Sequence, residues 1–176
     1  MSFGAQEAAG VTVALRYLQD KLPGEKIGVI AVSLGAASLV LSRPSTPLHA
    51  VVLESMYATI ADAVADRLAM RLGPVGRYFA PLLLWQLPLR TGVSAKELRP
   101  VMAVSDLRAP LLVASGTEDQ HTPWPETERI FAAGKQPKEL WAVQGAAHGD
   151  LYLYDRAAYQ ARILKFFSMY LQNQPW

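Results

Sequence analysis

Four short apolar runs recur along the chain, each separated from the next by a polar or helical segment. The runs cover residues 27–32, 50–53 and 111–114, with a weaker one at 140–143. Apolar side chains at successive positions are typical of strands covered on both faces, as in a parallel sheet. Residues 27–32 are rich in β-branched side chains and form the strongest of these predicted strands.

The segments between the runs carry apolar residues at helical spacing. Residues 5–22 and 159–171 each have one apolar stripe that continues over several turns. Thr122 and Pro123 are typical of an N-cap and the first helical position, and they predict a helix through residues 126–133. Strands alternating with helices predict a mainly parallel α/β sheet with right-handed crossovers and helices on both faces.

One long stretch, residues 56–107, interrupts this alternation. It has helical patterning but no convincing strand, and we interpret it as a helical cap inserted into a single domain that covers residues 1–176. The apolar run 79–89, with Tyr78 and Trp85, predicts the substrate-binding wall of a hydrophobic pocket. Plain core explains the run equally well, because buried cap helices and pocket walls look alike in sequence.

Composition and charge narrow the function classes. The chain is 51% hydrophobic and 18% charged, as a globular protein is. A formal charge of +2 does not indicate the strongly positive surface that nucleic acid binding needs. The three scattered His predict no metal site, and the absence of Cys predicts no disulfide. No apolar run is long enough to span a bilayer. The first ten residues lack a signal-peptide pattern, which favours a cytoplasmic location.

The strongest chemical motif follows the first strand. Ala31-Val32-Ser33-Leu34-Gly35 is close to G-x-S-x-G, in which a Ser sits on a tight turn between a strand and a helix. Such a turn brings the residues two before and two after the Ser into close contact, so small side chains are needed there. Ala31 departs from the motif by one methyl group. The alternative is that Ser33 merely caps the next helix.

Two further loops follow predicted strands. The third strand leads through Gly116 to Asp119, just before a predicted helix, and the fourth leads to His148 in Gly-Ala-Ala-His-Gly-Asp. An Asp in such a loop often only stabilises a turn, and a lone His is often only a surface residue. Both residues nevertheless lie at strand ends, where the active sites of parallel α/β sheets lie.

With the order Ser, Asp, His, the chain resembles the α/β-hydrolase family, from the helix before the nucleophile turn to the final helix. The resemblance implies a truncated α/β-hydrolase fold in which Ser33 is the nucleophile, His148 the general base and Asp119 the orienting acid. The backbone N–H of Leu34 would stabilise the oxyanion. A second oxyanion donor comes from an earlier loop in that family, and this sequence does not contain it.

Other acids and histidines compete for these roles. Glu54 ends the second strand, where some members of the family carry their acid, whereas Glu118 and Asp150 are expected to face solvent. His49 and His121 do not follow the strand-end pattern of a base, so they are expected to be structural.

The resemblance implies a cofactor-independent serine carboxylesterase that acts on small apolar esters. Thioesterase, peptidase and haloperoxidase activities stay open, as does a non-catalytic remnant that serves as a binding module. The family's nucleophile strand lies in mid-sheet, whereas here no strand precedes it. We therefore expect an exposed edge at residues 27–32 and a homodimer that covers it.

Overall fold

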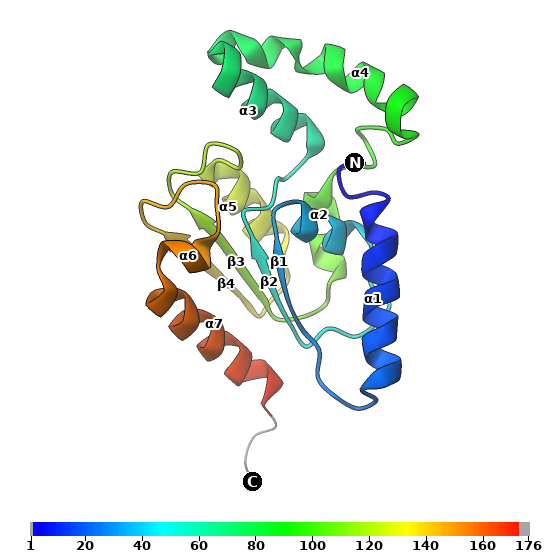
Figure 1. The fold of residues 1–176 in the computed structure, drawn as a ribbon, viewed down its shortest axis with the longest axis vertical. Coiled ribbons are helices and arrows are strands. Elements are labelled where there is room, and N and C mark those ends of the chain that lie inside the picture. The colour runs from blue at the N-terminus through cyan, green and yellow to red at the C-terminus, as the bar shows by residue number, and fades with distance from the viewer. Residues whose placement is uncertain (1, 173–176) are drawn as a thin grey trace.

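A computed structural model describes residues 2–172 and contains one parallel sheet. Its strands are β1 (Gly28–Val32), β2 (Ala50–Glu54), β3 (Leu111–Gly116) and β4 (Lys138–Val143), and they lie side by side in the order β1-β2-β3-β4 (Figure 1). Every neighbouring pair is parallel. All four predicted strands are confirmed, and the predicted fold class with them.

Helices cover both faces of the sheet. The helices of the body are α1 (Glu7–Lys21), α2 (Leu34–Leu41), α5 (Trp124–Ala133), α6 (Leu151–Tyr154) and α7 (Arg156–Leu171). Val51 and Val113 pack in one cluster with residues of α1, α2 and α5. Val52 and Leu112, at alternate positions, pack against Ile163 and Phe166 of α7 on the other face. This separation follows from the two-residue period of a strand.

The first strand differs from its neighbours. Every residue of β2 and β3 is buried, whereas Ile30 and Val32 of β1 are 43% and 45% exposed. Gly28 lies on the same face and admits the end of α7, since a Cβ there would come within 2.6 Å of Leu171. The expectation that this strand is covered on both faces is therefore wrong. Within residues 2–172 it lies at the edge of the sheet and pairs with β2 alone.

The insertion between β2 and β3 is helical, as predicted. It consists of α3 (Ile60–Leu72), the 3₁₀ segment η1 (Pro74–Phe79) and α4 (Ala80–Thr91), followed by two short 3₁₀ turns, η2 (Pro100–Met102) and η3 (Val104–Asp106). We refer to residues 60–91 as the cap. Its helices α3 and α4 lie at one end of the molecule, beyond the α2 and α5 side of the body (Figure 1). No helix within residues 2–172 is long and apolar enough to cross a membrane.

Candidate active site

Ser33 occupies a strained turn between β1 and α2. Its backbone has φ 48° and ψ −112°, a region that non-glycine residues rarely adopt. Ser33 is the N-cap of α2, but its hydroxyl makes no capping hydrogen bond. The buried Ala31 fits the predicted tight turn, whereas a Cβ on Gly35 would meet no atom within 4 Å. Among the described residues, the close contact that was expected to require a small residue at position 35 is therefore absent. The hydroxyl of Ser33 is free for contacts other than capping.

The structure brings Ser33, His148 and Asp119 together from loops that follow three different strands. The Oγ of Ser33 lies 3.4 Å from Nε2 of His148, and Nδ1 of His148 lies 2.8 Å from Oδ2 of Asp119. The first distance is long for a hydrogen bond, as is common before substrate binds. The arrangement is that of a nucleophile, a base and an acid that orients the base.

Hydrogen bonds hold the Asp119 carboxylate in place. Its Oδ1 accepts from the backbone N–H groups of His121 and Thr122, and its Oδ2 accepts from the Thr122 hydroxyl at 2.7 Å. Burial acts to raise the pKa of Asp119, but the hydrogen bonds from His148 and Thr122 outweigh it and lower that pKa. The carboxylate is therefore ionised and able to stabilise a charged imidazole. The predicted cap role of Thr122 is wrong, since Pro123 is the N-cap of α5.

The rival acids are placed elsewhere. Glu54 is buried at the end of β2, where its carboxyl accepts a 2.6 Å hydrogen bond from the Tyr159 hydroxyl instead of one from His148. Burial raises the pKa of Glu54, which disfavours the ionised form that an orienting acid needs. Glu118 and Asp150 are exposed, as expected, and Asp150 accepts a hydrogen bond from the backbone N–H of Leu153.

One of the two remaining histidines lies in the site. His49 accepts a hydrogen bond from the backbone N–H of Ile27, in keeping with a structural role. His121 instead packs against His148, with ring centroids 4.7 Å apart and an interplanar angle of 40°. Burial, the charge of His148 and that of Arg67 lower the pKa of His121. Sequence reasoning missed this neighbour, although its position two residues after Asp119 was a signal.

The backbone N–H of Leu34 stays a predicted oxyanion donor. Leu34 begins α2, so its backbone N–H belongs to the first turn, in which N–H groups have no intrahelical partner. Leu34 directly follows Ser33 in the chain. Among residues 2–172, no cluster of three or more His, Asp or Glu side chains could hold a metal ion.

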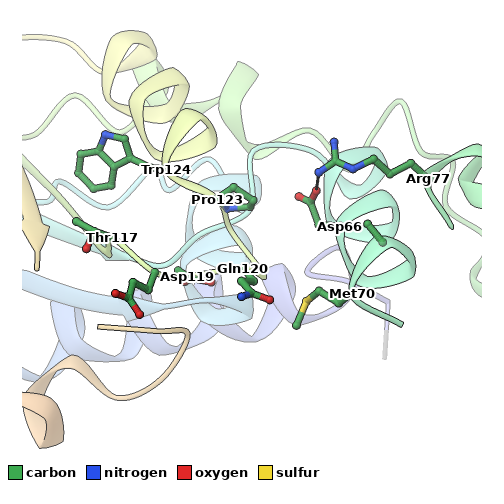
Figure 2. A pocket seen from close by; sticks show the side chains of 10 residues that line it. Asp66, Met70, Arg77, Thr117, Asp119, Gln120, Pro123 and Trp124 are labelled. Carbon is green, nitrogen blue, oxygen red and sulfur yellow. Dashed lines mark hydrogen bonds and ion pairs between the residues drawn. The ribbon is translucent and has the colours of Figure 1, made fainter. Parts of the chain in front are cut away.

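Two cavities separate the cap from the body. One, of about 510 Å³, is lined by cap residues including Val64, Leu68 and Leu83, together with His121. Figure 2 shows the other, of about 570 Å³, between the Asp119 loop and the cap residues Asp66, Met70 and Arg77.

Neither cavity is lined by Tyr78 or Trp85, the two residues predicted to bind substrate. Tyr78 is 84% exposed and Trp85 is 71% exposed, and neither lines the cavity beside His148 that includes Glu54 and Tyr159. The structure thus does not bring Tyr78 and Trp85 together with Ser33.

Buried carboxyl groups join the cap to the body. Asp66 of α3 and Glu126 of α5 meet there, while Asp66 also pairs with Arg77 within the cap at 2.6 Å and Glu126 accepts a 2.8 Å hydrogen bond from the backbone N–H of Ala58 within the body. Burial and a hydrogen bond with Asp66 raise the pKa of Glu126 to about 8. Two carboxyl groups can bond in this way only if one holds a proton. The raised pKa therefore indicates that the pair shares one proton at neutral pH.

No protein-family profile matches the chain. Its sequence is similar to two uncharacterized proteins, YqkD of Bacillus subtilis, with 23% identity over 169 residues, and Rv2307c of Mycobacterium tuberculosis, with 28% identity over 171 residues. Each match covers 94% of this chain but only 55% of the relative. The chain therefore spans about half the length of these relatives.

Solved structures show which fold the chain shares. An esterase of Pyrococcus furiosus, Pf2001, matches 98% of this chain with a TM-score of 0.69 and 18% identity, over 65% of its own length. An α/β-hydrolase enzyme from a lagoon-sediment metagenome, MGS-MChE2, matches 92% of this chain with a TM-score of 0.61 and 13% identity, over 70% of its own. The chain has part of the α/β-hydrolase fold. A puromycin-hydrolyzing peptidase of M. tuberculosis shares this part, with a TM-score of 0.71 and 20% identity over 99% of this chain and 26% of its own.

Proposed function

We propose that this chain carries the catalytic groups of a serine hydrolase that cleaves carboxylic esters through an acyl-enzyme. The observation that supports the proposal is the continuous path of contacts from Ser33 through His148 to the ionised Asp119. The α/β-hydrolase fold of an esterase neighbour agrees with it, although at this identity the likeness speaks for fold alone.

In the proposed reaction, Oγ of Ser33 attacks the ester carbonyl carbon while its proton passes to Nε2 of His148. Asp119 stabilises the imidazolium through Nδ1, and the N–H of Leu34 donates to the developing oxyanion. His148 then gives its proton to the departing alcohol, which leaves an ester on Ser33. A water attacks this ester, its proton passes through His148 to Oγ, and the carboxylic acid leaves.

The proposed substrate is a small apolar ester. Val64, Leu68 and Leu83 give the cavity beside His121 an apolar wall, and His121 connects that wall to the base. A volume of about 510 Å³ lies within the usual range for small-ligand sites. A cavity of this size is expected to favour short acyl chains over long-chain triglycerides.

A fluorophosphonate probe tests the proposal without knowledge of the substrate, because it labels only an activated Ser. Peptide mapping is expected to find the label on Ser33, and the matched variant Ser33→Ala is expected to stay unlabelled. Ser45, an exposed Ser in a loop, is an internal control. If a folded protein takes no label, the non-catalytic alternative, a binding module on the same fold, replaces the enzyme.

The assembly that belongs to this proposal is a homodimer across the edge of β1. Ile30 and Val32 are half-exposed there, and no charged side chain or Pro protects residues 28–32. A two-fold axis would pair β1 with its copy and cover both side chains. Light scattering at micromolar concentration is expected to give the mass of a dimer, and Ile30→Lys, at an exposed position, is expected to give a monomer. A wild-type monomer with full activity would refute the dimer.

A further inference from the structure

One face of α3 lines the cavity beside His121 with both apolar and positively charged side chains. Val64, Arg67, Leu68 and Arg71 lie three, four and seven residues along the helix from its first member, which places them on one side of it. Both Arg side chains are exposed, so they line the cavity at its open side. The wall that the proposed acyl chain would meet is therefore not apolar throughout.

The two Arg of this cavity are without an ionic partner in the part of the chain that the structure describes. Neither Arg67 nor Arg71 pairs with a carboxylate within residues 2–172, and no Asp, Glu or Lys in that range lines the cavity. Arg67 donates one hydrogen bond, to the backbone carbonyl of Ala63 at 3.0 Å. A guanidinium has five N–H donors, so most of the donors of Arg67 stay available to a ligand.

The acids of α3 make their contacts outside this cavity. Asp62 pairs with Arg129 at 3.2 Å, and Asp66 pairs with Arg77 at 2.6 Å. Neither acid belongs to the lining of the cavity beside His121. The positive charge on the cavity face of α3 is therefore not neutralised by the same helix.

His121 connects this charge to the candidate catalytic base. It lines the cavity, and its ring centroid lies 4.7 Å from that of His148. Burial is the largest cause of the lowered pKa of His121, and the charges of His148 and Arg67 add to it. His121 is therefore neutral at neutral pH, and the two Arg carry the positive charge of the cavity.

We propose that the ester hydrolysed at Ser33 carries a carboxylate at the far end of its acyl chain, and that Arg67 and Arg71 bind this carboxylate and determine specificity. The acyl carbons would lie against Val64 and Leu68, and the planar guanidinium groups match the two oxygens of a carboxylate. The simplest such substrate is a half ester of a dicarboxylic acid. The inference rests on the proposed function and refines it, since the substrate is apolar beside its ester carbonyl and charged at its other end.

The 4-nitrophenyl half esters of adipic, pimelic and suberic acid test the proposal. Each is compared with the ester in which a primary amide, similar in size but uncharged, replaces the terminal carboxylate. At least one half ester is expected to have a kcat/KM about tenfold above that of its amide, mainly through a lower KM, because two exposed ion pairs each contribute modestly. Ser33→Ala gives the background rate. Equal kcat/KM values within every pair would overturn the proposal.

Variants test whether the cavity causes the preference. Arg67→Gln with Arg71→Gln is expected to make kcat/KM nearly equal for half ester and amide. The matched control is Arg16→Gln with Lys21→Gln, which removes two exposed positive charges from α1 and is expected to keep the wild-type ratio. An equal fall of the ratio in both variants would show that overall charge steers the anion, and would overturn the assignment.

Circular dichroism and melting curves establish that each variant is folded. If the double cap variant does not fold, Arg71→Gln alone replaces it and is expected to lower the ratio of half ester to amide about threefold. An unchanged ratio in a folded Arg71→Gln variant would contradict the role of Arg71.

A binding measurement separates this proposal from the proposed function. Octanoate is expected to bind Ser33→Ala about tenfold more tightly than octanamide in calorimetric titrations, and loss of both Arg is expected to remove the difference. If Ser33 takes the fluorophosphonate label but neither the half esters nor octanoate are preferred, this proposal fails and the proposed function stands. If Ser33 takes no label while octanoate binding depends on the two Arg, the proposed function fails and only the anion-binding role of the cavity stands.

Discussion

The sheet and the cap of this protein differ in how far they bury their apolar side chains. In the sheet, β2 and β3 are buried along their whole length between helices on two faces. In the cap, α3 packs mainly against η1 and α4, and several of the largest side chains of α4 remain exposed. The sheet thus fixes its own geometry, whereas the cap depends on a few contacts with the body.

The candidate site takes its proposed catalytic residues from the body and its apolar cavity wall from the cap. Ser33, Asp119 and His148 follow β1, β3 and β4, so the register of a buried sheet sets the distances between them. Val64 and Leu68 belong to the cap, where Asp66 and Glu126 make the polar connection to the body. Changes in the body are therefore expected to affect chemistry, and changes in the cap to affect binding and cap attachment.

The largest expected effect is that of Ser33→Ala. Loss of the only proposed nucleophile is expected to reduce turnover of a short p-nitrophenyl ester by about 10⁴-fold or more. The change removes one hydroxyl that makes no capping bond, so the melting curve is expected to stay close to that of wild type. Retention of most of the activity would show that Ser33 is not the nucleophile.

Asp119→Asn is expected to lower kcat by about 10⁴-fold, since an amide favours the wrong tautomer of His148 and cannot stabilise its cation. Glu54→Gln is the matched control, because its partner is the Tyr159 hydroxyl. It is expected to cost far less. The opposite ranking in side-by-side kinetics would move the orienting acid to the end of β2.

The connection between cap and body is expected to respond to pH. The pKa of Glu126 is raised from 4.5 to about 8 in the folded protein, so folding keeps a proton that the unfolded chain releases. This contribution is fully present below about pH 4.5 and is lost as pH rises to about 8. Wild type is therefore expected to melt at a lower temperature at pH 8.5 than at pH 5.

Glu126→Gln is the test of that assignment. The amide cannot ionise, and its oxygen can still accept the hydrogen bond from Ala58. The variant is expected to lose several degrees of the melting difference between pH 5 and pH 8.5. Since Glu54 also has a raised pKa, some pH dependence is expected to remain. A pH dependence equal to that of wild type would show that Glu126 does not control the connection.

The smallest effect is expected in the pocket wall. Leu68→Ala enlarges the cavity beside His121 and is expected to raise KM for a short ester a few-fold while improving the relative rate on longer acyl chains. Trp85→Ala is expected to change KM less, because Trp85 is mostly exposed. A larger effect on KM for Trp85→Ala than for Leu68→Ala would indicate that the substrate binds at the residues predicted from the sequence.

The sequence by itself determined the elements and the order of the chemical groups. The two-residue and helical periods predict the strands and most helices, because each period records which side of an element is apolar. The loops of Ser33, Asp119 and His148 were recognisable because each lies at a strand end, and parallel strands end at the same edge of the sheet.

Only the tertiary structure decided which neighbours cover each face. Periodicity cannot tell a side chain against another helix from one against solvent, so it assigned Trp85 to a pocket and missed the contact between His121 and His148. The same reason explains β1: its exposed edge was expected from the sequence, but only the structure shows that Ile30 and Val32 are half-exposed on one face. The raised pKa of Glu126 likewise depends on Asp66, 60 positions earlier in the chain, which folding brings into hydrogen-bonding contact.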